Sequence, residues 1–216
     1  MLALQQLDEV AAPLPGSDID TDQIVPARFM HLRRVDYGRY LFHDQRYDES
    51  GAESVKFALN QHVWRESRIL VVGPNFGCGS SREQAVHALA DFGIRALVGT
   101  SFGDIFYANC MKNGVLAVRA RADFVSGLFH QLNAASGARV FIDLPQQLVV
   151  APDGSFVNFV IDAFHKESLL LGRDEIDLTL HYLADIERYE RCHGLASRAV
   201  RRKDGAHRRM QSKENS

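Results

Sequence analysis

A short apolar run, followed by a glycine-rich turn and a helical pattern, limits what this chain can fold into more than any other feature. The run Ile69–Val72 is β-branched and does not alternate with polar residues, which is typical of a buried strand. It leads into GPNFGCGSSREQAVHALADFG, residues 73–93. In the second half of this segment apolar residues recur at helical spacing, at Ala85, Ala88, Leu89 and Phe92. A strand, a turn and a helix in succession predict an α/β domain.

The rest of the chain continues this alternation and then changes it. Further strands are predicted at Ala96–Val98, Val115–Val118, Val140–Ile142, Leu148–Val150 and Phe156–Ile161. Helices are predicted over Ser101–Asn113, Asp123–Leu132 and Asp174–Arg191, and a long loop with short helical turns over residues 23–48. Strands alternate with helices in the middle and follow one another afterwards. We therefore expect an α/β fold with a mixed, partly parallel sheet flanked by helices.

Length and charge divide the chain into a body and a tail. The 216 residues suit one domain, which we place at residues 1–192. Residues 193–216 carry seven basic and two acidic side chains, a net charge of +5, and lack apolar periodicity. The remainder carries a net charge of −7. We expect the tail to be disordered and solvated.

These properties also argue against several classes of protein. An acidic body lacks the basic face that duplex nucleic acid requires. The sequence has no apolar run of the ~20 residues that a membrane helix needs, and no signal-peptide pattern. Three widely spaced cysteines without a CxxC pair argue against a disulfide framework and against a self-contained metal or iron–sulfur site. We expect a cytoplasmic protein that binds no metal itself.

The glycine-rich turn does not fit the known nucleotide-binding loops. A phosphate loop requires Gly-Lys-Ser/Thr after four intervening residues, but Cys78 stands there and the loop has no lysine. The dinucleotide pattern GxGxxG begins at Gly77 and Gly79 but places Arg82 at the third glycine. That glycine allows a helix and a strand to pack closely, so an arginine is a poor substitute.

An acyl-transfer nucleophile is a second hypothesis for this turn. GxSxG centred on Ser81 would need a glycine at the position of Glu83. Cys78 near a helix N-terminus is a chemically reasonable nucleophile, because that location lowers the pKa of a thiol. No histidine adjoins it in the sequence.

A small polycarboxylate is the third hypothesis. Ser80–Glu83 has the S-x-x-E form of a capping box, which predicts Ser80 as the helix N-cap. Neighbouring glycines let the backbone approach a ligand, and the helix N-terminus attracts anions. Arg82 adds a fork that binds carboxylates in bidentate fashion. These features converge on one turn, which a simple cap does not require.

Four segments together resemble a known family. They are Asp20–Ile24 (DTDQI), Pro26–Phe29 (PARF), Asn75–Glu83 (NFGCGSSRE) and Asp174–Leu180 (DEIDLTL). The glycine–serine segment is similar to the signature loop of the swivelling domain in the aconitase superfamily. The length and the separate chain resemble the small subunits of bacterial 3-isopropylmalate dehydratases. The resemblance covers about residues 5 to 191 and excludes the basic tail.

The resemblance implies a fold, a partner and a reaction. The fold would be the swivelling β/β/α domain. The partner would be a large subunit that forms a heterodimer with this chain and carries a [4Fe–4S] cluster. The heterodimer would convert 2-isopropylmalate into 3-isopropylmalate through isopropylmaleate, by dehydration and rehydration, in leucine biosynthesis.

The resemblance also implies roles for five residues. Ser80 would be the catalytic base, and Asp22 would match an active-site aspartate of the early loop. Ser81 and Arg82 would bind a substrate carboxylate. Arg28 would lie near the variable side chain of the substrate, on a looser alignment.

The residues themselves leave the substrate open. Phe29, Met30 and Leu32 could contact an isopropyl group, whereas Arg33 or Arg34 could meet an extra carboxylate. A homoaconitase-, citramalate- or dimethylmalate-type small subunit is therefore an alternative. A non-catalytic binding module is a further alternative. The presence of Ser80, Arg82 and Asp22 argues against it.

Overall fold

The computed structural model describes residues 1–32, 35–173 and 175–193. Residues Met1–Asp174 form one compact unit, and a second unit begins at Glu175. The strands are β1 (Gln6–Leu14), β2 (Ile69–Val72), β3 (Ala96–Gly99), β4 (Leu116–Arg119), β5 (Arg139–Asp143), β6 (Leu148–Val150) and β7 (Phe156–Asn158). The longer helices of the first unit are α3 (Glu83–Phe92), α4 (Asp104–Lys112), α5 (Ala122–Ala134) and α6 (Ala163–Leu171).

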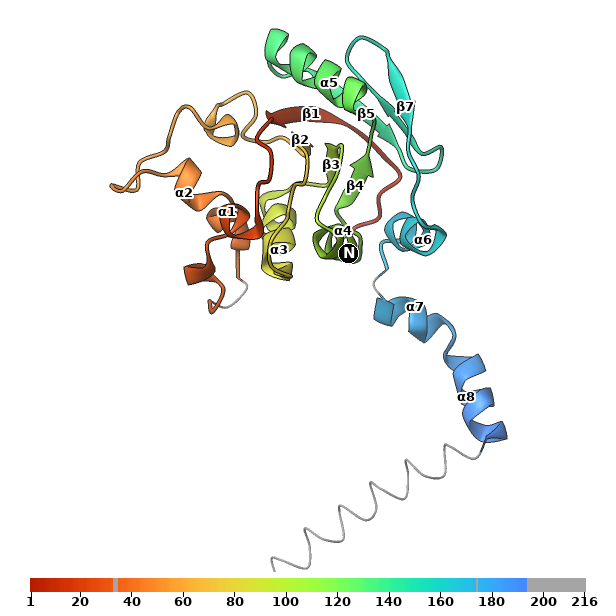
Figure 1. Ribbon diagram of the computed structural model, residues 1–216. Coiled ribbons are helices and arrows are strands. Elements are labelled where there is room, and N and C mark those ends of the chain that lie inside the picture. Colours follow the sequence, from red (N-terminus) through yellow and green to blue (C-terminus); the bar gives the residue numbers. More distant parts are fainter. Residues whose placement is uncertain (33–34, 174, 194–216) are drawn as a thin grey trace, which may run out of the picture. The chain divides into compact units, whose positions relative to one another are not determined.

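The seven strands form one mixed sheet in the order β4-β3-β2-β1-β5-β6-β7. The pairs from β1 to β4 are parallel, and those from β1 through β5 to β7 are antiparallel. In Figure 1, α5 covers one face of the sheet, and α3 and α4 lie on the other side. The predicted α/β fold with a partly parallel sheet is therefore confirmed.

The central strand β1 was not predicted, although both halves of the sheet meet on it. Its first half, Gln6–Val10, pairs with β5, and its second half, Ala11–Leu14, pairs with β2. Pro13 therefore has a partner strand on one side only. A proline without an N–H is normally confined to sheet edges, and this change of neighbour gives Pro13 an edge-like position inside the sheet.

The segment between β1 and β2 is a long loop with short turns, as predicted. Its turns are α1 (Thr21–Ile24), η1 (Ala27–Phe29), η2 (Tyr37–Tyr40), α2 (His43–Arg46) and η3 (Ala58–Asn60). Leu41 and Phe42 are fully buried in this segment, so it belongs to the core. Arg33 and Arg34, named above as possible carboxylate contacts, lie outside the described residues.

The helices also differ from the prediction in two places. Helix α6 was not predicted, although Asp162 caps its N-terminus and Gly172 ends it in the left-handed conformation. The predicted helix over Asp174–Arg191 is divided into α7 (Glu175–His181) and α8 (Leu183–Cys192). The domain boundary at residue 192 stays a prediction, and the tail from residue 194 onward lies outside the described residues. Among the helices of the described ranges, none is both long and apolar enough to cross a membrane.

Candidate functional site

The glycine-rich loop leaves the carboxyl end of β2 and crosses the loop that precedes α1. Gly73 passes so close to the backbone of Gly16 that an added Cβ would lie 2.3 Å from its carbonyl oxygen. Gly77 has a φ of +73°, and an added Cβ there would lie 2.2 Å from the ring of Phe106. Both positions therefore require glycine for steric reasons.

Backbone hydrogen bonds fix this loop to the residues before α1. The N–H of Gly77 donates to the carbonyl oxygen of Ile19 at 2.7 Å, and the N–H of Thr21 donates to that of Cys78 at 3.0 Å. Asp20 and Cys78 form an isolated parallel bridge. Two segments that are about sixty residues apart in the sequence are thus joined side by side by strand-like hydrogen bonds.

Thr21 links this contact to the first serine. Its buried hydroxyl lies 3.2 Å from the carbonyl oxygen of Ser80, to which it donates, and 3.3 Å from the hydroxyl oxygen of Ser80. Ser80 and Ser81 themselves are exposed. The loop therefore presents two serine hydroxyls to solvent and holds the first by a neighbouring hydroxyl. No role was predicted for Thr21 from the sequence.

The predicted capping box is wrong. Helix α3 begins at Glu83, Arg82 is its N-cap residue, and no side chain caps it. Ser80 lies three residues before the helix, where it contacts Thr21. The N–H groups in the first turn of α3 consequently lack a side-chain acceptor among the described residues, and they favour an anion at this end.

Arg82 and Asp22 form an ion pair beside these serines. Nη1 of Arg82 donates to Oδ1 of Asp22. The arginine side chain is 22% exposed and the aspartate side chain 53% exposed. Asp20 accepts from the N–H of Gln23 at 2.8 Å and so begins the turn that carries Asp22. The structure thus brings Ser80, Arg82 and Asp22 together.

The cysteines do not match the acyl-transfer hypothesis. Burial and the nearby Asp18 and Asp20 carboxylates raise the pKa of the Cys78 thiol, which disfavours a thiolate nucleophile. Cys110 is fully buried, and burial raises its pKa well above the usual value. Among the described residues, no cluster of three or more histidine, cysteine, aspartate or glutamate side chains is placed to hold a metal ion.

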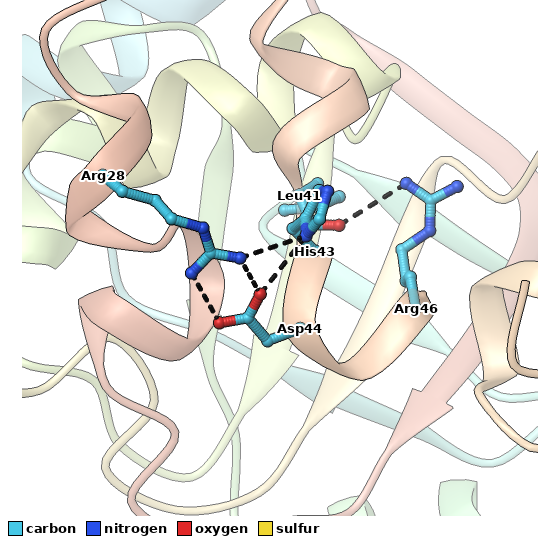
Figure 2. Close-up of polar contacts among 5 residues, drawn as sticks. All are labelled: Arg28, Leu41, His43, Asp44 and Arg46. Carbon is cyan, nitrogen blue, oxygen red and sulfur yellow. Dashed lines mark hydrogen bonds and ion pairs between the residues drawn. The ribbon is translucent and has the colours of Figure 1, made fainter. Parts of the chain in front are cut away.

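Arg28 lies in a separate cluster, which Figure 2 shows. Its guanidinium forms a two-pronged ion pair with Asp44, and Nη2 lies 3.3 Å from Nδ1 of His43. The arginine also lies over the ring of Phe29, 4.6 Å from its centroid. The hydrogen bond from Arg28 lowers the pKa of Asp44 to about 2. Among the described residues, no hydrogen bond or ion pair joins Arg28 to the glycine loop.

The turn after Arg28 is fixed from within the early loop. The hydroxyl of Tyr37 donates to the carbonyl oxygen of Leu32 at 2.8 Å. The rings of Phe29 and Tyr40 are stacked with centroids 4.3 Å apart. Phe29, named above as a possible contact for an isopropyl group, thus packs within this segment, whereas Leu32 is 38% exposed.

Comparisons with known proteins identify the origin of this arrangement. A family model described as the aconitase C-terminal domain matches residues 1–123. The 3-isopropylmalate dehydratase small subunit of Rhodopseudomonas palustris (strain HaA2) is 50% identical over 185 residues, which cover 85% of this chain and 92% of that protein. The protein of the same name from Methylobacterium radiotolerans is 47% identical over an equal length, with the same coverage of both chains.

A solved structure agrees with these relatives. The crystal structure of 3-isopropylmalate dehydratase from Methanocaldococcus jannaschii matches with a TM-score of 0.61 and 27% identity. The match covers 85% of this chain and 99% of that one. The chain therefore belongs to the family of 3-isopropylmalate dehydratase small subunits, which is built on the aconitase C-terminal domain.

Proposed function

We propose that this chain is the small subunit of a cytoplasmic 3-isopropylmalate dehydratase that acts in leucine biosynthesis. The reaction converts 2-isopropylmalate into 3-isopropylmalate through isopropylmaleate. The observation that carries this proposal is the 50% identity to a small subunit of that name over 85% of the chain. The ion pair between Arg82 of the glycine loop and Asp22 of α1, together with the contact of Thr21 with Ser80, supports it.

In this proposal Ser80 is the base. Its alkoxide accepts the proton from the substrate carbon next to the one that bears the hydroxyl. The electron pair of that C–H bond forms the double bond as the hydroxyl leaves, and water then adds in the opposite sense. The contact with Thr21 orients the Ser80 hydroxyl, and the uncapped start of α3 favours negative charge nearby.

Ser81 and Arg82 bind a substrate carboxylate. Asp22 occupies Nη1 of Arg82, and the guanidinium has further donors at Nη2 and Nε for the ligand. Asp22 thus positions the arginine as well as adding charge to the site. Both serines are exposed on an open surface, which is consistent with a site completed by a large subunit.

We further propose that the large subunit carries the [4Fe–4S] cluster. This chain offers one buried cysteine, one half-buried cysteine and an exposed one in the second unit, a set that does not fit a cluster. Bound in the partner, the cluster would supply an iron that takes the substrate hydroxyl.

Arg28 is proposed to lie near the variable side chain of the substrate. Asp44 takes both terminal nitrogens of Arg28, whereas Asp22 takes only Nη1 of Arg82, so Arg28 has fewer donors left for an additional carboxylate. This favours an uncharged substituent such as isopropyl over the longer acidic arm of homoaconitate.

The test uses the full chain mixed with a cluster-loaded large subunit. Ultraviolet absorbance is followed as the unsaturated intermediate forms from 2-isopropylmalate and, in parallel, as unsaturated homoaconitate is consumed by hydration. We expect no turnover by this chain alone and a clear preference for 2-isopropylmalate in the mixture. A preference for homoaconitate would contradict the substrate assignment.

Variants of the two adjacent serines distinguish the proposed catalytic role from the proposed binding role. Ser80→Ala should lower kcat by about 10²–10⁴-fold, because it removes the base. Ser81→Ala should chiefly raise KM, and Ser136→Ala, at another exposed serine, should change neither. Near-normal turnover of Ser80→Ala would refute its role as base.

A further inference from the structure

We propose a second ligand site in this chain, which binds a small oxyanion, either a carboxylate or a phosphate. It is a pocket at the amino ends of β2 and β3, and Ser67, Arg68 and Arg95 supply its donors. The proposal does not depend on the dehydratase function, because none of these residues belongs to the glycine loop.

Strand direction places the pocket at the opposite edge of the sheet from the glycine loop. Arg68 directly precedes β2 and Arg95 directly precedes β3, and these two strands are parallel. The N–H of Arg95 donates to the carbonyl oxygen of Arg68 at 2.8 Å, so the two arginines are held next to each other. The pocket has a volume of about 540 Å³, which is ample for a small anion.

Two buried donors in this pocket have no acceptor. Ser67 is 2% exposed, and its hydroxyl has no hydrogen-bond partner among the described residues. Nε of Arg95 is buried and is likewise without a partner there, while Nη2 of the same side chain donates to the carbonyl oxygen of Leu2 at 2.8 Å. Buried donors are almost always paired in folded proteins, and an acceptor atom at the wall of this pocket would pair these two.

Among the described residues, no carboxylate forms an ion pair with either Arg68 or Arg95. Arg68 is exposed, and its guanidinium forms no hydrogen bond or ion pair with the residues that the structure describes. Burial, and then the charge of Arg68, lower the pKa of Arg95. Arg65, on the same wall, is already paired with Glu53. An anion between Arg68 and Arg95 would relieve the repulsion between them.

Other groups around the pocket limit the charge of the ligand. Glu9 and Glu66 line it, although Glu9 lies 3.9 Å from Arg139. The C-terminal end of α3 lies on the same wall and contributes partial negative charge. These groups disfavour a polyphosphate or a tricarboxylate. The pocket therefore fits an anion with one or two charges.

The proposal is tested by calorimetric titration of the full chain with sodium malonate and, separately, with inorganic phosphate. Sodium chloride keeps the ionic strength constant in both titrations. We expect saturable binding of at least one anion, and the stronger of the two identifies the ligand class. Arg68→Gln should weaken that binding about tenfold. Arg121→Gln, at an exposed arginine of the same charge near α5, should leave it unchanged.

Ser67→Ala distinguishes a ligand contact from a structural one. Because the hydroxyl is buried without a partner, its removal should leave the melting temperature of the ligand-free chain unchanged or higher, while anion binding weakens. A lower melting temperature with unchanged binding would contradict the role of Ser67. Absence of saturable binding for both anions, or equal weakening in Arg68→Gln and Arg121→Gln, would overturn the site.

Discussion

Arg82 and Arg28 each meet an aspartate, but the two ion pairs lie in different settings. Arg82 is 22% exposed and stands between a strand and a helix on a loop that glycines and backbone hydrogen bonds hold in place. Arg28 is 53% exposed and stands on a single turn, where it lies over the ring of Phe29. An arginine–aspartate pair alone therefore does not identify a ligand site. How much the arginine contributes to ligand binding depends on how firmly the surrounding backbone holds it.

The largest expected loss of stability concerns the glycine loop that carries Arg82. Gly77→Ala combines a left-handed φ with a Cβ 2.2 Å from the ring of Phe106. We expect a loss of about 2–5 kcal/mol in the free energy of unfolding, from backbone strain and overpacking together.

Gly79→Ala is the matched control for that prediction. Its φ is +91°, but its nearest neighbour, Cβ of Asp20, lies at an ordinary 3.4 Å. Strain alone should cost about 1–2 kcal/mol. Urea unfolding of both variants checks the difference, and equal losses would show that Phe106 moves aside without cost.

The two arginines should differ in the reconstituted enzyme. Arg82→Gln removes charge-assisted hydrogen bonds to the substrate and leaves Asp22 unpaired. We expect kcat/KM for 2-isopropylmalate to fall roughly tenfold to a hundredfold. Arg28→Gln breaks an exposed pair and should cost about threefold or less. If both variants lost activity equally, Arg28 would contact the substrate as directly as Arg82 does.

The smallest effect concerns the stability that the exposed pair contributes. The pKa of Asp44 falls from 3.8 to about 2 in the folded chain, so its contribution is present above about pH 4 and is lost as the pH falls toward 2. Because the pair is exposed, we expect Asp44→Asn to cost less than about 1 kcal/mol near neutral pH. Urea titrations should show this difference shrink at about pH 3. A difference that stayed constant with pH would assign the effect to packing.

Much of the fold follows from local patterns, whereas the central strand does not. Buried runs such as Ile69–Val72 and the stripe on α3 have the periodicities that their structures require. β1 carries Asp8, Glu9 and Pro13, which are all unfavourable in a central strand. They are tolerated because each half of β1 has a different neighbouring strand. This pairing is a tertiary property, so it cannot be predicted from a local sequence pattern. Helix α6, by contrast, had readable signals in Asp162 and Gly172.

In the candidate site, too, some features follow from the local sequence and others only from tertiary contacts. The residue types in the loop already indicated an anion, and the family resemblance named Ser80, Ser81, Arg82, Asp22 and Arg28. The contacts of Thr21 with Ser80 and of Asp22 with Arg82 span about sixty residues and could not be inferred from spacing. The local S-x-x-E pattern likewise did not reveal that α3 begins at Glu83 and that Ser80 contacts Thr21 instead of capping the helix.

The divided pairing of β1 has a consequence for the order of folding. Its second half pairs with β2 less than sixty residues later, but its first half pairs with β5 129 to 137 residues later, as in Gln6 opposite Asp143. Closing such a distant contact is slow, because the chain entropy is lost before the contact is gained. During synthesis, the parallel half of the sheet can therefore form before Gln6–Val10 pair with β5. Gln6–Val10 would thus be among the last residues of the sheet to pair, although β1 is synthesised before the other six strands.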